Sequence, residues 1–402
     1  MLVSTIFTSW LVLATSTTSS HAFQHLRSTN SSNTDLSTAT LNLVEARLAE
    51  TATDTWVSGT HAEALLELYY PSLSVFSSNY ISAVDNPEKV RKIVDYWAAR
   101  RQNHFKILAQ VAGGAAGDPP SLGVPWLVIS HQISEQNSQL KSKLWNDAFA
   151  QIDYLLGDVP RTRDGAISHR PPNEPVQLWA DFVYMVPPFL AYSGVLSDNS
   201  TLLREAYNQC KLYRQYLKLK NSNAVQHVVL GSWHDRGVWN TGNAWLAAGM
   251  TRVIATLQHS AYSSAFSGEI DNLKRWAREV LEASFSSIQP DGLLLNYLDD
   301  PKSFTDSAGS ALLASTAYRL AVLDPTTDYS STLKSAFAIR SAVNARVHRK
   351  TGWLSGAVDP LSWKKQTDQS PEGQAFVLLL KAAWRNYRSS LKTRVLSALS
   401  SL

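Results

Sequence analysis

The strongest constraint on the fold of this 402-residue chain is a helical pattern that repeats along nearly its whole length. Between residues 88 and 101, apolar side chains recur at i, i+3, i+4, i+7 and i+8, the spacing of one face of a helix. Comparable patterns occupy ten further segments: 42–53, 60–70, 123–134, 139–156, 201–219, 243–259, 268–287, 307–323, 330–347 and 370–387. Alternating patterns, typical of strands, are confined to 227–231 and 292–298. The sequence therefore predicts an all-α fold with at most short strands.

Glycine and proline separate these segments, for example at Pro171-Pro172 and Pro290-Asp-Gly292. No low-complexity linker follows residue 40, and hydrophobic residues make up 44% of the chain, enough to bury a sizeable core. We therefore expect a single domain over residues 41–402. Consecutive helical hairpins can close into a double ring, an α/α toroid. Because the sequence has no strict repeat, its periodicity sets neither the number of hairpins nor the closure of the ring.

The first 40 residues have the pattern of a targeting segment followed by a polar stretch. Residues 2–14 are apolar, and Ser20-His21-Ala22 resembles the site at which a secretory signal is cleaved. At about 13 residues, the apolar run is shorter than the roughly 20 that a bilayer crossing takes. Residues 23–40 are rich in Ser and Thr, so we expect them to be disordered. These features predict a signal peptide over 1–22 and a secreted, extracellular protein.

Charge and cysteine content exclude several classes of function. Lys and Arg number 37 and Asp and Glu 33, and a net charge of +4 does not indicate nucleic-acid binding. The single cysteine, Cys210, allows no disulfide within the chain, and its helical surroundings predict a buried thiol. We expect a monomer with no nucleic-acid and no membrane partner.

The candidate chemistry centres on Asp181, in the run LWADFVYMVPPFLAYSG, with Trp179 two residues and His169 twelve residues before it. A carboxyl group among aromatic residues, with a histidine within reach, suits an acid catalyst that acts on a sugar. Apolar neighbours raise the pKa of such a group, so that it keeps its proton. An aspartate that only begins a helix would instead have a lowered pKa, because it complements the helix dipole. The residues alone leave both interpretations open.

Four segments together carry a resemblance to a known family. They are RTRDGAISHR, LWADFVYMVPPFLAYSG, VWNTGNAWLAAGMTRVIATL and SPEGQAFVLLLKAAW. The chain resembles glycoside hydrolase family 105 in these segments, most closely its fungal-type branch, over residues 60–390. That family comprises unsaturated rhamnogalacturonyl and glucuronyl hydrolases and is related to family 88. The resemblance implies an (α/α)6 barrel and a mechanism without a metal or other cofactor.

The resemblance also implies a reaction. The substrate is an oligosaccharide left by a polysaccharide lyase, which ends in a Δ4,5-unsaturated uronic acid. An acid protonates C4 of the vinyl ether and water adds at C5, after which the hemiketal collapses and releases the neighbouring sugar. In this resemblance Asp181 matches the catalytic acid/base. Asp118 matches a second aspartate through the spacing D-x4-G-V, although an aspartate before a proline is also an ordinary turn residue.

Substrate-binding residues follow from the same matches. His169 and His227 match two active-site histidines, with His234 a nearby competitor, and Trp179 and Trp245 match the aromatic residues of the site. Trp245 is expected to stack on a sugar ring, with packing in the core as the alternative. The histidines lack the spacing of zinc ligands.

One position departs from the family. Many relatives carry arginine where Thr241 stands, and a threonine cannot make a bidentate charged contact with an acidic sugar. Arg236 or Arg163 is the expected replacement. The segment from Ser370 to Phe376 is interpreted as a helix start, with Ser370 as cap and Pro371 in the first turn, and is given no chemistry.

Two other functions remain open on this sequence. Asp118 and Asp181 are also compatible with a conventional glycosidase that acts on saturated uronides, since such enzymes use a pair of carboxyl groups. The Thr241 position is compatible with a catalytically impaired carbohydrate-binding relative.

Overall fold

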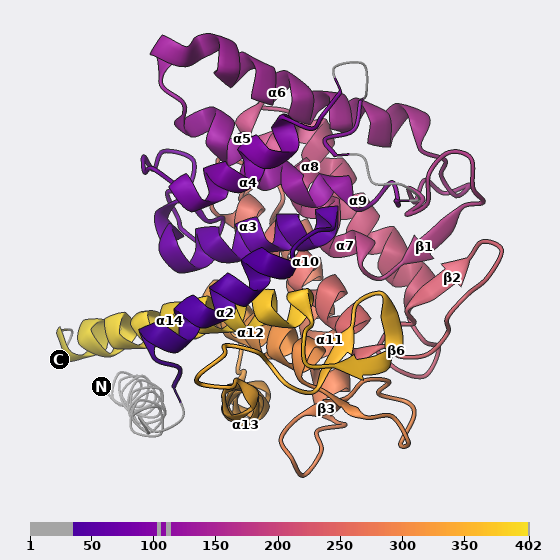
Figure 1. The fold of residues 1–402 in the computed structure, drawn as a ribbon, viewed down its shortest axis with the longest axis vertical. Coiled ribbons are helices and arrows are strands. Elements are labelled where there is room, and N and C mark those ends of the chain that lie inside the picture. Colours follow the sequence, from indigo (N-terminus) through magenta and orange to yellow (C-terminus); the bar gives the residue numbers. More distant parts are fainter. Residues whose placement is uncertain (1–34, 103–105, 110–113, 401–402) are drawn as a thin grey trace, which may run out of the picture.

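The structure is a computed structural model that describes residues 35–102, 106–109 and 114–400 (Figure 1). Within these residues, longer helices alternate along the chain between an outer and an inner layer. The outer helices are α2 (Thr38–Thr51), α4 (Glu88–Ala98), α6 (Ser138–Asp153), α9 (Ser200–Leu217), α11 (Ser267–Phe285) and α13 (Ser330–Arg346). The inner helices are α3 (Thr55–Tyr69), α5 (Gly123–Gln132), α8 (Pro187–Leu196), α10 (Asn240–Gln258), α12 (Ser307–Leu323) and α14 (Pro371–Ser400).

The inner helices form a closed ring. Each packs against the next in the order α3, α5, α8, α10, α12 and α14, and α14 packs back against α3. Each outer helix after α2 packs on an inner helix that is its neighbour in the chain, whereas α2 packs on α14. The described chain therefore forms six helical hairpins, and the predicted (α/α)6 barrel in a single domain is confirmed.

Burial follows the two layers. Nearly every residue of α10 and α12 is buried, because inner helices are covered on all sides. The outer helix α11 buries one stripe that includes Ile270, Leu273, Ala277 and Leu281, and its charged residues face away from the ring. Gly249 on α10 lets the backbones approach, since a Cβ there would lie 2.1 Å from the carbonyl oxygen of Val183.

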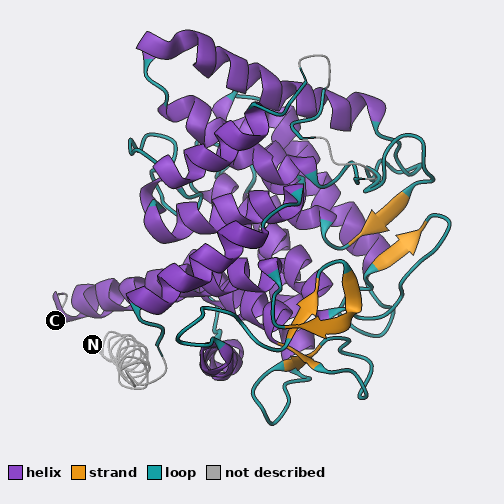
Figure 2. Cartoon of the chain, in the orientation of Figure 1, coloured by secondary structure: helices purple, strands orange, loops and turns teal. Residues whose placement is uncertain are grey.

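The inner helices all begin at one end of the barrel, because each is reached from an antiparallel outer helix. The connections at this end form three two-stranded antiparallel sheets, which Figure 2 shows on one side of the molecule. The pairs are β1 (Gln177–Trp179) with β2 (Val228–Leu230), β3 (Leu294–Leu295) with β4 (Thr305–Asp306), and β5 (Ala357–Asp359) with β6 (Ser362–Thr367).

The opposite end of the ring contains buried ion pairs between inner helices. Arg252 on α10 pairs with Glu63 on α3 at 2.8 Å and also with Glu67. Arg319 on α12 pairs with the other oxygen of Glu67 at 2.6 Å. Arg385 on α14 donates to the backbone oxygen of Glu67 at 2.9 Å. Four inner helices are thus tied together around one glutamate.

Most predicted elements lie within two to five residues of the observed ones, and the two predicted strand segments contain β2 and β3. The expected disorder of 23–40 extends too far, because Leu36 is buried in the core and α2 begins at Thr38, where Ser37 Oγ accepts from the Thr40 amide at 3.1 Å. The signal peptide over 1–22 and the rest of the polar stretch up to residue 34 lie outside the described residues. Within the described chain, no helix has both the length and the apolarity of a membrane span.

Candidate active site

Acidic residues stand at the starts of five of the six inner segments, all at the same end of the barrel. Asp54 precedes α3, and Asp118 precedes the turn Pro119–Leu122 (η2) that leads into α5. Asp181 precedes the short helix α7 (Phe182–Met185), Asp306 caps α12, and Glu372 is the second residue of α14. The positive ends of helix dipoles favour negative charge at such positions, so this end of the barrel gathers carboxyl groups around its axis.

Asp181 lies next to His227 because β1 and β2 pair. Trp179 is in register with Val228, and the Ala180 amide donates to the His227 carbonyl at 2.9 Å. This pairing sets His227 Nε2 3.6 Å from Asp181 Oδ2. Both atoms are buried and neither has a hydrogen-bond partner among the described residues. The hydrogen-bonding capacity of both atoms is therefore unused within the described chain.

The other ring nitrogen of His227 is held by Asp235. Its Nδ1 lies 3.0 Å from Asp235 Oδ2, which also accepts a hydrogen bond from the Tyr297 hydroxyl at 2.5 Å. Burial alone would raise the pKa of Asp235, but the hydrogen bonds from His227 and Tyr297 hold it at about 2. An ionised carboxylate only accepts, so Nδ1 carries a proton, and Nε2 is the ring nitrogen that faces Asp181.

Sequence reasoning missed Asp235. Backbone hydrogen bonds between Val228 and Asp235 close the loop that follows β2 and return the carboxylate to His227. An acidic residue eight positions after His227, across the glycine of a predicted strand end, was the available signal.

Asp118 and His169 form a second pair. His169 Nε2 lies 3.5 Å from Asp118 Oδ1, and the imidazole stacks on the Trp179 indole with ring centroids 5.0 Å apart. Burial lowers the pKa of His169 to about 3, so the ring is neutral. Gly117 makes room for it, since a Cβ at that position would lie 2.4 Å from His169 Nδ1.

The carboxyl groups of the site hold protons more tightly than isolated acids do. Burial raises the pKa of Asp181, and the nearby His227 opposes part of that shift. Burial and the charge of Asp181 raise the pKa of Asp118 to about 7. Burial and the charges of Asp181, Asp306 and Asp118 raise the pKa of Glu372 to about 8. Because these groups interact, they titrate as a set, and the site keeps protonated carboxyl groups near neutral pH.

Glu372 was also missed. Its Oε1 accepts from Trp56 Nε1 at 2.7 Å. The segment was interpreted only as a helix start, which it is, since Ser370 Oγ accepts from the Gly373 amide at 3.2 Å and α14 begins at Pro371. A glutamate in a first helical turn has an ordinary role there, so the sequence offered no further signal.

Two predicted binding residues are corrected. Trp245 is fully buried one turn inside α10, where it packs against Tyr184 and Phe376, so no sugar ring can stack on it. Thr241 is also fully buried, and its hydroxyl donates to Asp306 Oδ2 at 2.9 Å. The helical register turns both side chains into the ring. The alternative interpretation of Trp245, core packing, is the one observed.

The remaining predicted residues divide by exposure. His227 faces Asp181, whereas His234 is exposed on the loop that follows β2. Arg236 is exposed on the same loop, and Arg163 is exposed before α7, so their part in binding stays a prediction. Cys210 is buried, as expected. Among the described residues, no group of three or more His, Cys, Asp or Glu side chains is arranged to hold a metal ion.

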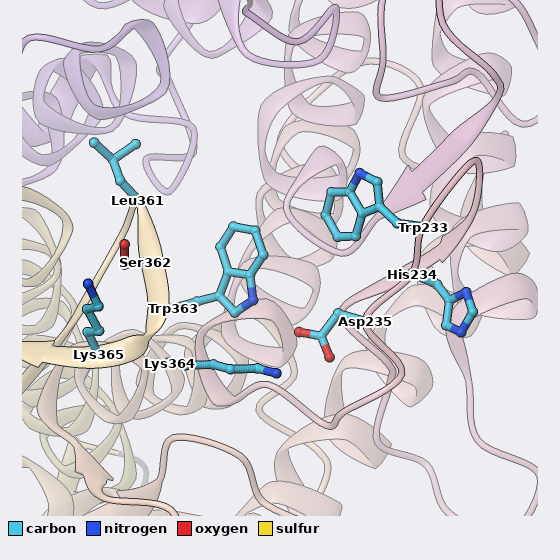
Figure 3. Close-up of a pocket in the computed structure, with 8 residues that line it drawn as sticks. All are labelled: Trp233, His234, Asp235, Leu361, Ser362, Trp363, Lys364 and Lys365. Atoms are coloured by element: carbon cyan, nitrogen blue, oxygen red, sulfur yellow. The ribbon is translucent and has the colours of Figure 1, made fainter.

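A cavity of about 380 Å³ opens beside this site (Figure 3). Trp233 and Trp363 line it, together with Asp235 and the exposed residues His234 and Lys364. Trp179 connects the cavity to the carboxyl groups, because its ring contacts both His169 and Trp233. The site therefore combines buried acids with an aromatic opening.

Comparison with known proteins adds a family and a fold. The family model described as Glycosyl Hydrolase Family 88 matches residues 128–344, more than half of the chain. A comparison with curated protein sequences finds no match.

Several solved structures are similar. A possible member of the GH105 family from Salmonella enterica is 18% identical, with 86% of this chain and 94% of that chain covered and a TM-score of 0.64. A family 105 glycoside hydrolase from C. acetobutylicum is 14% identical, covering 86% and 99%, with a TM-score of 0.64. The unsaturated glucuronyl hydrolase of Bacillus sp. GL1 is 15% identical, covering 88% and 96%, with a TM-score of 0.57. At these identities the likeness concerns the fold, the same barrel of six helical hairpins.

Proposed function

This chain belongs to glycosyl hydrolase family 88 and is a glycoside hydrolase, and from that premise we propose that it removes a terminal Δ4,5-unsaturated uronic acid from oligosaccharides. The motif resemblance to family 105 and its relative family 88 is confirmed, while the fungal-type branch stays a prediction. The observation that carries the proposal is the pair Asp181 and His227, in which the buried carboxyl group lies 3.6 Å from a histidine ring nitrogen.

The first chemical step is proton delivery. An alkene carbon is a weak base, so its protonation needs a carboxylic acid that is still protonated at the working pH. Burial raises the pKa of Asp181, which is the direction that this step needs. The Asp181 proton passes to C4 of the sugar, the π electrons of C4=C5 form the new C–H bond, and the positive charge at C5 is shared with the ring oxygen.

The second step is the addition of water. A water oxygen bonds to C5, and its proton goes to the carboxylate that Asp181 has become. His227 Nε2 lies beside that carboxylate without a hydrogen-bond partner among the described residues, so it can hold the water by a hydrogen bond. The resulting hemiketal at C5 then collapses and releases the neighbouring sugar.

Recognition of the acidic sugar does not depend on an arginine at position 241. Asp118 and Glu372, with pKa values of about 7 and about 8, are protonated below those values and so donate hydrogen bonds. A protonated carboxyl group donates to a sugar hydroxyl or to the uronate carboxylate. This arrangement favours substrate binding on the acidic side of neutral pH.

The test is a turnover assay on lyase-generated disaccharides from pectin, glucuronan and arabinogalactan. The proposal expects the ultraviolet absorbance of the conjugated alkene to disappear with the wild-type protein and to persist with Asp181→Asn. Cleavage of a saturated aryl uronide without any loss of the alkene signal would replace the proposal with a conventional glycosidase. Binding without turnover on all three substrates would leave a carbohydrate-binding protein.

We also propose that the protein acts outside the cell, as the apolar segment 2–14 and Ala22 suggest. Expression of the full chain in a secretory host, followed by N-terminal sequencing, tests this. A secreted product that begins at Phe23 is the expected result, and retention of the uncleaved chain inside the cells contradicts it.

A further inference from the structure

We propose that Trp233 and Trp363 form the binding surface for the sugar that the reaction releases, and that they select oligosaccharides over uronides with a small aglycone. This inference rests on the proposed function, because it identifies the released group as a pyranose. The occupant is the ring bonded to the terminal unsaturated sugar.

The two tryptophans form an open aromatic surface. Their ring planes differ by 13° and their centroids lie 6.1 Å apart. Figure 3 shows both indoles at the cavity, with Asp235 and Lys364 near them. Trp179 meets both with its ring nearly perpendicular, at centroid distances of 5.3 Å to Trp233 and 5.8 Å to Trp363. The C–H face of a pyranose packs on aromatic surfaces of this kind.

This surface is continuous with the catalytic pair and lies on its solvent side. The Trp363 ring contacts the His227 ring at 5.0 Å, and His227 in turn faces Asp181. His227 is 1% exposed, whereas Trp233 is 43% exposed. A terminal sugar whose C4 lies at Asp181 therefore occupies the buried part, and the next ring extends outward onto the tryptophans.

Hydrogen bonds hold both tryptophan backbones in place before any ligand arrives. Gln177 Nε2 donates to the Trp233 carbonyl at 2.6 Å, and Gln177 Oε1 accepts from Trp179 Nε1 at 2.8 Å. Asn296 Nδ2 donates to the Trp363 carbonyl at 2.7 Å. A preorganised surface loses little conformational entropy on binding, so the stacking contact adds to affinity.

The solvent exposure of Trp233 indicates that this side chain binds a ligand rather than stabilising the fold. Large apolar side chains that remain in solvent beside a cavity commonly mark a binding site. Leu361 lines the same cavity and is 67% exposed, but it offers no flat ring, so it serves as the matched control.

The experiment compares Trp233→Ala and Leu361→Ala on a methyl Δ4,5-uronide and on a disaccharide with the same terminal sugar. For Trp233→Ala we expect the KM for the disaccharide to rise about tenfold while its kcat stays at the wild-type value. The kinetic constants for the methyl uronide should not change. Trp233→Phe should recover part of the loss, and Leu361→Ala should behave as wild type. An equal loss on both substrates, or none on the disaccharide, overturns the proposal.

A binding measurement separates this inference from the proposed function. Calorimetry of the disaccharide with Asp181→Asn, alone and combined with Trp233→Ala or Trp363→Ala, needs no turnover. Weaker binding in both double variants supports the aromatic surface even if the wild-type protein turns over no unsaturated substrate. Unchanged binding in both contradicts it even if turnover is observed.

Discussion

The two ring nitrogens of His227 have different partners, and this difference matters at the scale of single residues. Nδ1 is bound by the ionised Asp235, and Nε2 faces Asp181. In the proposed mechanism Asp235 is a positioning residue, because it holds a proton on Nδ1 of the ring whose other nitrogen faces Asp181. Tyr297 supports the same carboxylate from the other side.

Asp235→Asn should change the tautomer. The new amide donates to Nδ1, so the imidazole proton moves to Nε2, where it stabilises the Asp181 carboxylate and lowers its pKa. In the proposed mechanism Asp181 acts in its protonated form, so activity is lost as pH rises through that pKa, and a lower pKa moves this loss to lower pH. We expect kcat to fall about tenfold or more, with the alkaline limb of the kcat–pH profile displaced to lower pH.

Tyr297→Phe is the control for that prediction. It removes one donor to Asp235 and leaves the contact between Asp235 and His227 intact. The alkaline limb of the kcat–pH profile of Tyr297→Phe should lie at the same pH as in the wild-type protein. If Asp235→Asn lowered kcat but left the alkaline limb of the kcat–pH profile at the wild-type pH, Asp235 would have a structural role and would not control the proton on His227.

Glu372→Gln should stabilise the protein in a pH-dependent way. The pKa of Glu372 is raised by burial from 4.5 to about 8, so the folded state binds the proton more tightly than the unfolded state. The wild-type protein therefore loses stability as pH rises from 4.5 to 8, by a few kcal/mol in order of magnitude. Glutamine cannot ionise, so the gain in Tm should grow between pH 5 and pH 8. A constant difference between those values would contradict the raised pKa.

The sequence led to Asp118, Asp181, His169 and His227, which the structure brings together. It did so because each lies in a motif whose spacing is local. Glu372 and Asp235 were not predicted because their neighbours in the site come from distant segments. Helix α14 reaches the site only when the ring closes, and Asp235 reaches it through a loop that folds back. The stacking role of Trp245 was misassigned since only the helix register shows which way its ring points.

At the scale of elements, the site depends on how closely α10 approaches α7. Gly249→Ala places a methyl group 2.1 Å from the Val183 carbonyl, two residues after Asp181. We expect a loss of about 1–3 kcal/mol in the free energy of unfolding, together with lower activity because the start of α7 moves. Denaturant unfolding and the turnover assay measure the two effects.

Gly268→Ala in α11 is the matched control, because no atom lies within 4 Å of its added Cβ. Alanine there should stabilise the helix by about 0.5–1 kcal/mol. If the two variants changed the free energy of unfolding equally, the close approach at Gly249 would not contribute to stability.

The helical elements were largely predictable, whereas only β2 and β3 of the six strands in the described chain were. Helix α8 was missed because Pro187 and Pro188 resemble a break, whereas proline fits the first turn of a helix. The strands β5 and β6 have no alternating pattern, since their residues line the mouth of the barrel rather than a sheet core. Such strands are specified by the connections that hold them.

At the scale of the molecule, the ring is tied at its far end around Glu67. Glu67→Gln leaves Arg252 and Arg319 buried with one carboxylate fewer, so the free energy of unfolding should fall by about 3–5 kcal/mol. The pH profile of the protein that remains folded should not change, because the site lies at the opposite end.

The exposed pair Glu88 and Lys92 provides the comparison, at 3.0 Å on the outer helix α4. Glu88→Gln should cost less than about 0.5 kcal/mol. Equal losses in the two variants, measured by denaturant unfolding, would show that the buried ion pairs do not stabilise the ring.

The closed ring itself was expected from family resemblance and not from periodicity. Periodicity identifies helices but not the contact of α14 with α3, which joins segments some 300 residues apart.

That contact also sets an order for biosynthesis. While the chain is emerging from the ribosome, α3 has no partner on one side, and Glu372 is not yet at the mouth of the barrel. The ring and the complete set of carboxyl groups arise in the same event, after α14 has been translated. A chain that ends before α14 therefore lacks both the closed ring and the Glu372 carboxyl group.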